Sequence, residues 1–295
     1  MTYDDAAAGA HGPARRVRRR ATGKQLMQAS WALLRQDREL LWLPVLGVVF
    51  AVLAAVVLAV PGLVLGALAG DATVSQVGYW IALALALFAA TCVSIFFQTA
   101  IVIGANERAE GRDPTRSLVL RQAWGRRGRI LKWSALTTTV GLLLRVIQDR
   151  LGSVGAILTA LGGLAWGVVS FLVVPVLVAE DVGPVTAVKR SATLLKETWG
   201  TSLRTTVRFG WIALVLWLPT IAVIGLGVWL LVQGGTAADA TGVGLLVLGV
   251  FAGIVLATVF SAVGGYARAL IYRYATGQAT PGVEPQLLAG AFRSR

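Results

Sequence analysis

Residues 175–199 of the chain read PVLVAEDVGPVTAVKRSATLLKETW, and this stretch decides the fold class. An apolar run ends at Ala179, and the acids Glu180 and Asp181 follow at once. Gly183 and Pro184 then predict the start of a new helix, because proline's fixed φ and missing N–H suit a first helical turn. The stretch therefore joins an apolar helix to a second helix through a short acidic link.

The second helix of this stretch is predicted to be amphipathic. Its apolar face carries Val185, Val188, Ala192, Leu195 and Trp199, and its polar face carries Lys189, Arg190, Thr193, Lys196 and Glu197. A basic amphipathic helix that follows an apolar one directly is typical of a helix lying in the headgroup layer beside a membrane span.

The composition of the whole chain favours a membrane protein. Of the 295 residues, 56% are hydrophobic and only 14% are charged, and the mean hydropathy is +0.73. A water-soluble domain of this length could hardly bury so much apolar surface. The single cysteine, Cys92, excludes an intrachain disulfide framework, and the single histidine, His11, leaves no histidine cluster for zinc. We expect no cofactor and no metal.

We predict an all-α fold, a polytopic bundle of six transmembrane helices with short amphipathic helices on the cytoplasmic surface. Residues 1–23 form a basic tail, residues 24–278 the membrane domain and residues 279–295 a cytoplasmic tail. The six apolar segments cover about 40–68, 77–103, 132–148, 154–179, 209–232 and 243–264. The third is the weakest, since it is short and contains Arg145, which we interpret as a snorkelling residue rather than part of an ion path.

The basic residues predict the orientation of these segments. The net charge of +13 comes from arginines that lie between the apolar runs, where the positive-inside rule places them. With both termini in the cytoplasm, only Arg145 and Arg150 among the bases face outward, together with Asp71, Asp149 and Asp239. We therefore predict a multi-pass protein of the plasma membrane. We expect no nucleic-acid partner, because no reading element accompanies the basic tail.

A threefold pattern runs through the chain. Trp31, Trp124 and Trp199 each lie on a predicted basic surface helix, and each such helix precedes a pair of apolar segments. The pattern indicates three tandem units, each a surface helix followed by a transmembrane hairpin. The alternative is that these tryptophans only mark the membrane interface, which tryptophan favours in any membrane protein.

The apolar segments offer few groups for catalysis. Glu180 and Asp181 are adjacent, so on a helix they point about 100° apart and make a poor pair of catalytic carboxylates. No metalloprotease, nucleophile-elbow or phosphate-binding-loop motif is present. Among the internal polar side chains, Gln98 is the candidate ligand group, because a buried amide needs a partner.

The pattern P-V-L-V-x-E-x-x-G-P-x-x-A-x-x-R-S at 175–191, and ALIYRYATG at 269–277, resemble a prokaryotic family of six-span integral membrane proteins of unknown function. The first stretch is also similar to the membrane domain attached to some glycerophosphoryl diester phosphodiesterases. The catalytic barrel of those enzymes is absent here, so the resemblance implies a fold and a location and transfers no catalytic residue. The residues that form the shared motif are Pro175, Glu180, Gly183, Pro184, Arg190, Ser191 and Trp199.

Our first functional hypothesis is a non-enzymatic membrane protein, a scaffold or a module that interacts with lipids or a partner. Its cytoplasmic cations would contact anionic lipid headgroups or an acidic protein that the sequence does not identify. These cations, here called the basic collar, are Arg121, Arg126, Arg127, Lys189, Arg190 and Lys196.

Two further hypotheses stay open. The alternative is a transporter or lipid-handling permease, with a polar cavity between hairpins lined by Gln98, Thr139, Ser170 and Ser261. The last is an enzyme acting on lipid phosphates, which would have arginines to bind phosphate but lacks an evident acid–base pair.

Overall fold

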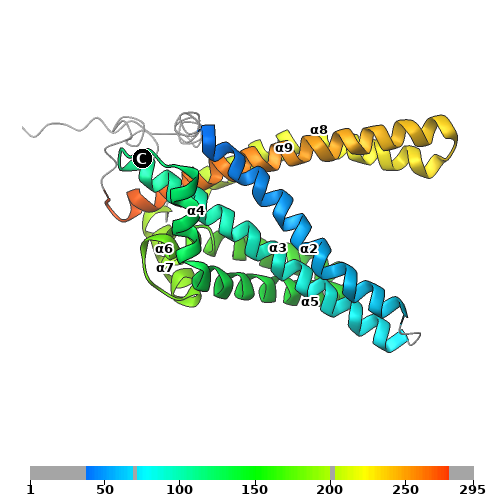
Figure 1. Ribbon diagram of the computed structural model, residues 1–295, viewed down its shortest axis with the longest axis horizontal. Coiled ribbons are helices and arrows are strands. Elements are labelled where there is room, and N and C mark those ends of the chain that lie inside the picture. Colours follow the sequence, from blue (N-terminus) through cyan, green and yellow to red (C-terminus); the bar gives the residue numbers. More distant parts are fainter. Residues whose placement is uncertain (1–37, 69–71, 200–202, 279–295) are drawn as a thin grey trace, which may run out of the picture.

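The computed structural model describes residues 38–68, 72–199 and 203–278, and in these residues the fold is all-α. Helical hairpins diverge from a common base, as Figure 1 shows. The base consists of α4, α6 and α7 together with the adjoining ends of α3 and α9. The predicted basic tail, the surface helix around Trp31 and the C-terminal tail lie largely or wholly outside the described residues.

The first hairpin consists of α2 (Trp42–Leu68), preceded by the 3₁₀ turn η1 (Arg38–Leu41), and α3 (Ala72–Ala109). Small residues let the two helices approach closely. A Cβ added at Gly62 would lie 2.6 Å from the Cβ of Ala82, and one added at Gly66 would lie 3.2 Å from the carbonyl oxygen of Ser75. Such small-residue contacts are the usual way in which apolar helices pack inside a membrane.

The second hairpin lies within one continuous element, α5 (Arg127–Val169). The chain reverses at Gly152, whose φ of 54° and ψ of −128° are not helical. The hydroxyl of Thr159 donates to the carbonyl of Leu144 at 3.0 Å, so residues 153–169 run back along residues 127–151. The reversal falls at the link expected between the third and fourth apolar segments.

A break follows α5, and the sequence analysis missed it. We expected one apolar segment over 154–179, but residues 170–172 leave the helix and α6 (Val173–Ala179) begins after them. Pro175 explains the break, because it has no N–H to donate to the carbonyl of Phe171 one turn earlier. The chain then turns through residues 180–183 into α7 (Pro184–Trp199), which begins at the proline as expected.

The third hairpin consists of α8 (Leu203–Gln233) and α9 (Thr236–Ala275), and the chain reverses at Gly234 and Gly235. These glycines have φ values of 71° and 111°, which other residues rarely adopt. α9 continues well past the expected end of the last apolar segment at residue 264 and carries its final turns into the base.

Two of the predicted short helices are present as α4 and α7, and both lie in the base. α4 (Arg116–Gly125) begins after Thr115, whose hydroxyl accepts a hydrogen bond from the backbone N–H of Leu118 at 3.4 Å. On α7 the buried residues are Ala187, Ser191, Leu194 and Leu195, whereas Val185 is exposed. The expected apolar face is therefore wrong by a rotation of about one residue, because packing against α5 and α6 selects the neighbouring stripe.

The core lies where the hairpins meet, and the hairpins themselves are apolar on the outside. Tyr266, Leu270, Leu172 and Val119 are fully buried in the base, while Phe251 on α9 is 66% exposed. Four helices in the described residues are long and apolar enough to cross a membrane: Glu39–Leu68, Thr73–Ala109, Arg127–Ala179 and Ala238–Ala275. These features indicate a membrane protein.

Candidate functional site

The first polar cluster of the base closes the C-terminal end of α6. Arg129 donates through Nη1 to the carbonyl oxygens of Leu177 at 2.8 Å and Glu180 at 3.0 Å, and it pairs with Asp181 at 3.2 Å. The last carbonyls of a helix have no partner within it and carry partial negative charge, so a guanidinium suits this position. Arg129, at the start of α5, thereby holds the end of α6.

Arg126, which we predicted as a lipid contact in the basic collar, takes part in the same closure. Its Nε donates to the carbonyl of Val178 at 3.3 Å and its Nη1 to that of Gln122 at 2.9 Å. The side chain is half-buried, and this burial lowers the pKa of Arg126, with a further contribution from the nearby charge of Arg129. The structure thus gives Arg126 partners within the protein.

The second cluster surrounds Glu180, which the motif singled out. Its Oε1 accepts hydrogen bonds from Arg190 on α7 at 3.2 Å and from the hydroxyl of Tyr272 on α9 at 2.9 Å. Glu180 therefore joins the link after α6 to α7 and to the end of the third hairpin. Asp181 points elsewhere and pairs with Arg129, so the two adjacent acids do not act together.

Ser191 supplies the partner that the helix break requires. The buried backbone N–H of Leu172, just before α6, donates to the Ser191 hydroxyl at 3.0 Å. An N–H freed by a helix break and buried without an acceptor would be costly, and the hydroxyl removes this cost. Pro175, which opens the break, and Ser191, which satisfies it, are thus two parts of one local structure.

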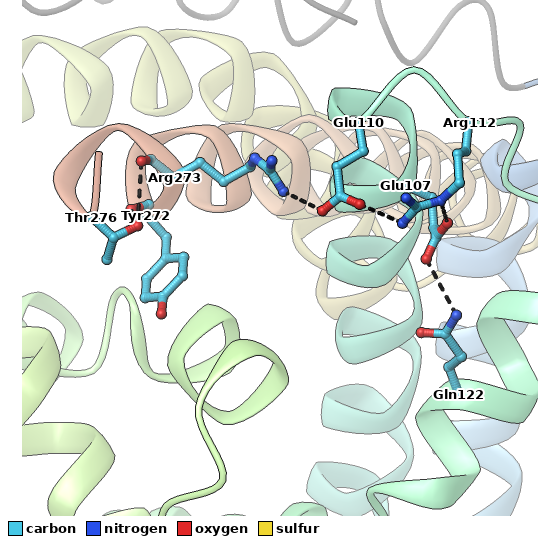
Figure 2. Close-up of polar contacts among 7 residues, drawn as sticks. All are labelled: Glu107, Glu110, Arg112, Gln122, Tyr272, Arg273 and Thr276. Atoms are coloured by element: carbon cyan, nitrogen blue, oxygen red, sulfur yellow. Dashed lines mark hydrogen bonds and ion pairs between the residues drawn. The ribbon is translucent and has the colours of Figure 1, made fainter. Parts of the chain in front are cut away.

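The third cluster joins the loop after α3 to α9, and Figure 2 shows its side chains. Arg273 donates to the carboxylate of Glu110 at 2.8 Å, and Arg112 bridges Glu110 and Glu107. Gln122 of α4 donates to Glu107 at 3.3 Å, which extends the network to the surface helix. The hydrogen bond from Arg273, above all, holds the pKa of Glu110 below its usual value.

A fourth contact lies further from the base and includes Gln98, the amide predicted as a ligand group. Arg268 on α9 donates through Nη1 to Oε1 of Gln98 on α3 at 3.2 Å. The Cζ atom of Arg268 lies 5.4 Å from the centroid of the Phe171 ring, at the break after α5. Gln98 therefore has a protein partner, contributed by a residue 170 positions later in the chain.

The remaining collar residues stay on the surface. Arg121, Arg127, Lys189 and Lys196 are exposed and form no ion pair with any residue that the structure describes. Arg190 is also exposed, but it pairs with Glu180. Trp124 on α4 is 63% exposed, and the guanidinium of Arg127 lies 5.8 Å from its ring. Trp199 ends α7, and its side chain is outside the described part.

Two of the residues proposed for a transport cavity, Thr139 and Ser170, donate to their own helix. The hydroxyl of Thr139 donates to the carbonyl of Ala135 at 2.8 Å, and that of Ser170 to the carbonyl of Trp166 at 2.6 Å. Hydroxyls on apolar helices commonly bond in this way to their own helix. Over residues 38–68, 72–199 and 203–278, no group of three or more His, Cys, Asp and Glu side chains is placed to hold a metal ion.

A family model, described as a family of unknown function (DUF6159), matches residues 77–282, which is most of the chain. The chain belongs to DUF6159. No curated protein and no solved structure matches it. The expectation of a family of unknown function is confirmed, while the likeness to the phosphodiesterase membrane domain stays a prediction.

The DUF6159 match includes every polar cluster of the base. It begins inside α3, before Gln98, and extends past the end of α9, beyond Arg273. Sequence reasoning missed Glu110, Arg268 and Arg273 as members of a site. The available signal was the run YARALIYRYATG at 266–277, in which Arg268 and Arg273 follow an apolar segment without a break in the helix.

Proposed function

We propose that this DUF6159 protein is a non-enzymatic integral protein of the plasma membrane, whose hairpins cross the bilayer six times with the base in the cytoplasm. Two features support six crossings over four. The long apolar helix Arg127–Ala179 reverses at Gly152, so it supplies two crossings. α8 contains the apolar stretch Trp217–Gln233, pairs with α9 and supplies another.

The distribution of charge supports the orientation. The cations of α4 and α7 lie at the base, at one end of the hairpins. Asp149 lies three residues before the reversal at Gly152, and Asp239 lies in the first turn of α9, just after the reversal at Gly234 and Gly235. Arginines and lysines that flank membrane helices favour the cytoplasm. Both termini lie on that side in this proposal.

Cysteine accessibility tests the topology. In a Cys92→Ser background, single cysteines would be introduced by Arg121→Cys, Lys189→Cys, Asp149→Cys and Asp239→Cys. An impermeant maleimide should label the cysteines at 149 and 239 in intact cells, and those at 121 and 189 only after lysis. Labelling of position 121 or 189 in intact cells would overturn the orientation.

The proposed molecular role is a membrane-embedded scaffold whose exposed collar cations contact anionic headgroups. One observation carries it: Arg121, Arg127, Lys189 and Lys196 are exposed beside apolar hairpins and free of ion pairs with the described residues, whereas the inward-facing arginines have acceptors in the protein. Each cation near an anionic leaflet contributes about 1 kcal/mol. Trp124 beside Arg127 suits the same interface.

Lipid enrichment around the full chain tests this role. The protein would be reconstituted with neutral and anionic phospholipids and extracted with its nearest lipids, which are then quantified. We expect anionic lipid to be enriched for the wild type and less so for the quadruple variant Arg121→Gln, Arg127→Gln, Lys189→Gln, Lys196→Gln. The effect should weaken at high salt.

The matched control is the double variant Arg145→Gln, Arg150→Gln, which removes cations beside the reversal of the second hairpin at Gly152. Its lipid enrichment should equal that of the wild type if the collar acts on the cytoplasmic leaflet. Equal enrichment for the wild type and the quadruple variant would contradict the collar.

A further inference from the structure

Arg268 is a charged residue that connects all three hairpins. It belongs to α9 of the third hairpin, it donates to Gln98 of α3 in the first, and its guanidinium stacks over Phe171 at the end of the second. All three side chains are half-buried.

The hydrogen-bonding capacity of Arg268 is mostly unused among the described residues. A guanidinium has five N–H donors, and here one of its nitrogens donates to Gln98. Its Nε is buried, and among the residues that the structure describes it has no acceptor and no carboxylate pairs with the guanidinium. Arginines in the nearby base differ from Arg268 in having carboxylate partners: Arg273 pairs with Glu110, and Arg190 pairs with Glu180.

A half-buried cation whose Nε is fully buried and has no anion beside it among the described residues is in an unfavourable position. The free energy needed to remove a guanidinium from water is far larger than the stabilisation that one amide and one aromatic face provide. We therefore expect a neutralising anion at such a position. The planar fork of arginine matches the oxygens of a phosphate group, to which it can donate two parallel hydrogen bonds.

The position of Arg268 also suits a phosphate group. It precedes Arg273 by five residues, or roughly 7.5 Å along the helix, so it lies between the polar base and the apolar hairpins. If the base faces the cytoplasm at the membrane surface, this is the level of phospholipid headgroups. This step depends on the membrane insertion proposed above but not on the basic collar.

We propose that Arg268, with Gln98 and Phe171, forms a binding site for a phosphate group between the hairpins. The group belongs either to a phospholipid headgroup or to a free phosphate, and both would bind through the same guanidinium. The site is separate from the exposed collar cations, which lie on α4 (Arg121), at the start of α5 (Arg127) and on α7 (Lys189 and Lys196).

Titration of the full chain tests the site. The purified protein, depleted of lipid in detergent, would be titrated with short-chain phosphatidylglycerol in one arm and inorganic phosphate in the other, with binding measured by calorimetry. We expect saturable binding in at least one arm, weakened about tenfold or more by Arg268→Gln. The control Arg150→Gln, which removes an exposed arginine far from the site, should bind like the wild type.

A second variant covers the case in which Arg268→Gln does not fold. Gln98→Glu keeps the shape of the side chain and places a carboxylate beside Arg268, so it supplies an internal anion. We expect it to weaken the binding of the probe about tenfold and to raise the melting temperature of the protein without ligand.

The possible outcomes distinguish a lipid headgroup from a free phosphate, and the phosphate site from the basic collar. Binding of phosphatidylglycerol alone identifies a lipid headgroup, and binding of inorganic phosphate identifies a soluble ligand; both support the site. No saturable binding in either arm, or binding unchanged in Gln98→Glu, overturns it. Failure of the collar proposal would be seen separately, in the lipid-enrichment experiment. The quadruple collar variant used there keeps Arg268, so its result does not depend on this site.

Discussion

Single hydrogen bonds in the base give the motif residues Ser191 and Glu180 their structural roles. Ser191 and Glu180 were recognised only as parts of a pattern, and the structure gives each a defined partner: the N–H of Leu172 for Ser191, and Arg190 and Tyr272 for Glu180. Leu172 and Tyr272 are buried, so replacing the group that bonds to either of them leaves a buried polar group that water does not readily satisfy, whereas Arg190 is exposed.

Ser191→Ala should destabilise the protein through the broken helix. The substitution leaves the buried N–H of Leu172 without an acceptor, which costs about 1–3 kcal/mol. Thermal unfolding of the purified full chain in detergent measures this. Thr193→Ala is the matched control, since its exposed hydroxyl donates only to its own helix at Lys189 and its loss should cost about 0.5 kcal/mol or less. Similar losses in both variants would refute the role of Ser191.

Because of Glu110, we expect the protein to lose stability in acid. The pKa of Glu110 in the folded state is lowered from 4.5, chiefly by the hydrogen bond from Arg273. The contribution of its carboxylate to the free energy of unfolding is therefore complete above pH 4.5 and is lost as the pH falls through the folded-state pKa. The melting temperature of the wild type should therefore fall below pH 4.5, and that of Glu110→Gln should fall less. Glu197→Gln, which changes an exposed acid on α7, should follow the wild type. Identical pH profiles for all three proteins would contradict the prediction.

Among the elements, the second hairpin depends on one backbone position. α5 reverses at Gly152, where φ is positive and a Cβ would meet no other atom within 4 Å. A substitution there tests conformation alone, because no steric clash with a neighbour contributes.

Gly152→Ala should cost about 1–3 kcal/mol, since an L-residue is strained at this φ and ψ. Thermal unfolding provides the measurement. Gly163→Ala is the control: Gly163 is helical with free space around it, so alanine should be neutral or stabilise the protein by about 0.4–1 kcal/mol. Equal stability of the two variants would show that the reversal does not depend on glycine.

At the level of the assembled hairpins, the end of α9 joins two loops that are distant in sequence. Tyr272 bonds Glu180 after α6, and the adjacent Arg273 bonds Glu110 after α3. Since neighbouring residues of one helix hold both loops, the two contacts should stabilise each other.

A double-mutant cycle of Tyr272→Phe and Glu110→Gln measures this coupling. We expect the double variant to lose less stability than the sum of the single variants, with an interaction energy of at least about 0.5 kcal/mol, because each change loosens the same helix end. Additive losses would mean that the loops are held independently.

The hairpins and their turns follow from local signals in the sequence. Apolar runs predicted the long helices, the Gly183-Pro184 pair predicted the start of α7, and the polar link around Gly152 predicted the reversal of α5. These features depend on residues close in the chain, so composition and periodicity are sufficient to find them. The break before α6 depends equally on nearby Pro175, but a single proline inside an apolar run is often tolerated, and its effect was missed.

The assignment of the cations required the tertiary structure. Arg121, Arg126, Arg127 and Arg129 are close in sequence and alike in chemistry, yet Arg126 and Arg129 close the end of α6 while Arg121 and Arg127 face outward. The sequence determined that cations gather beside the apolar helices, because local composition sets this. Which of them find a carbonyl or carboxylate, and that Arg268 reaches Gln98 without a carboxylate among the described residues, depends on helices packed from distant parts of the chain.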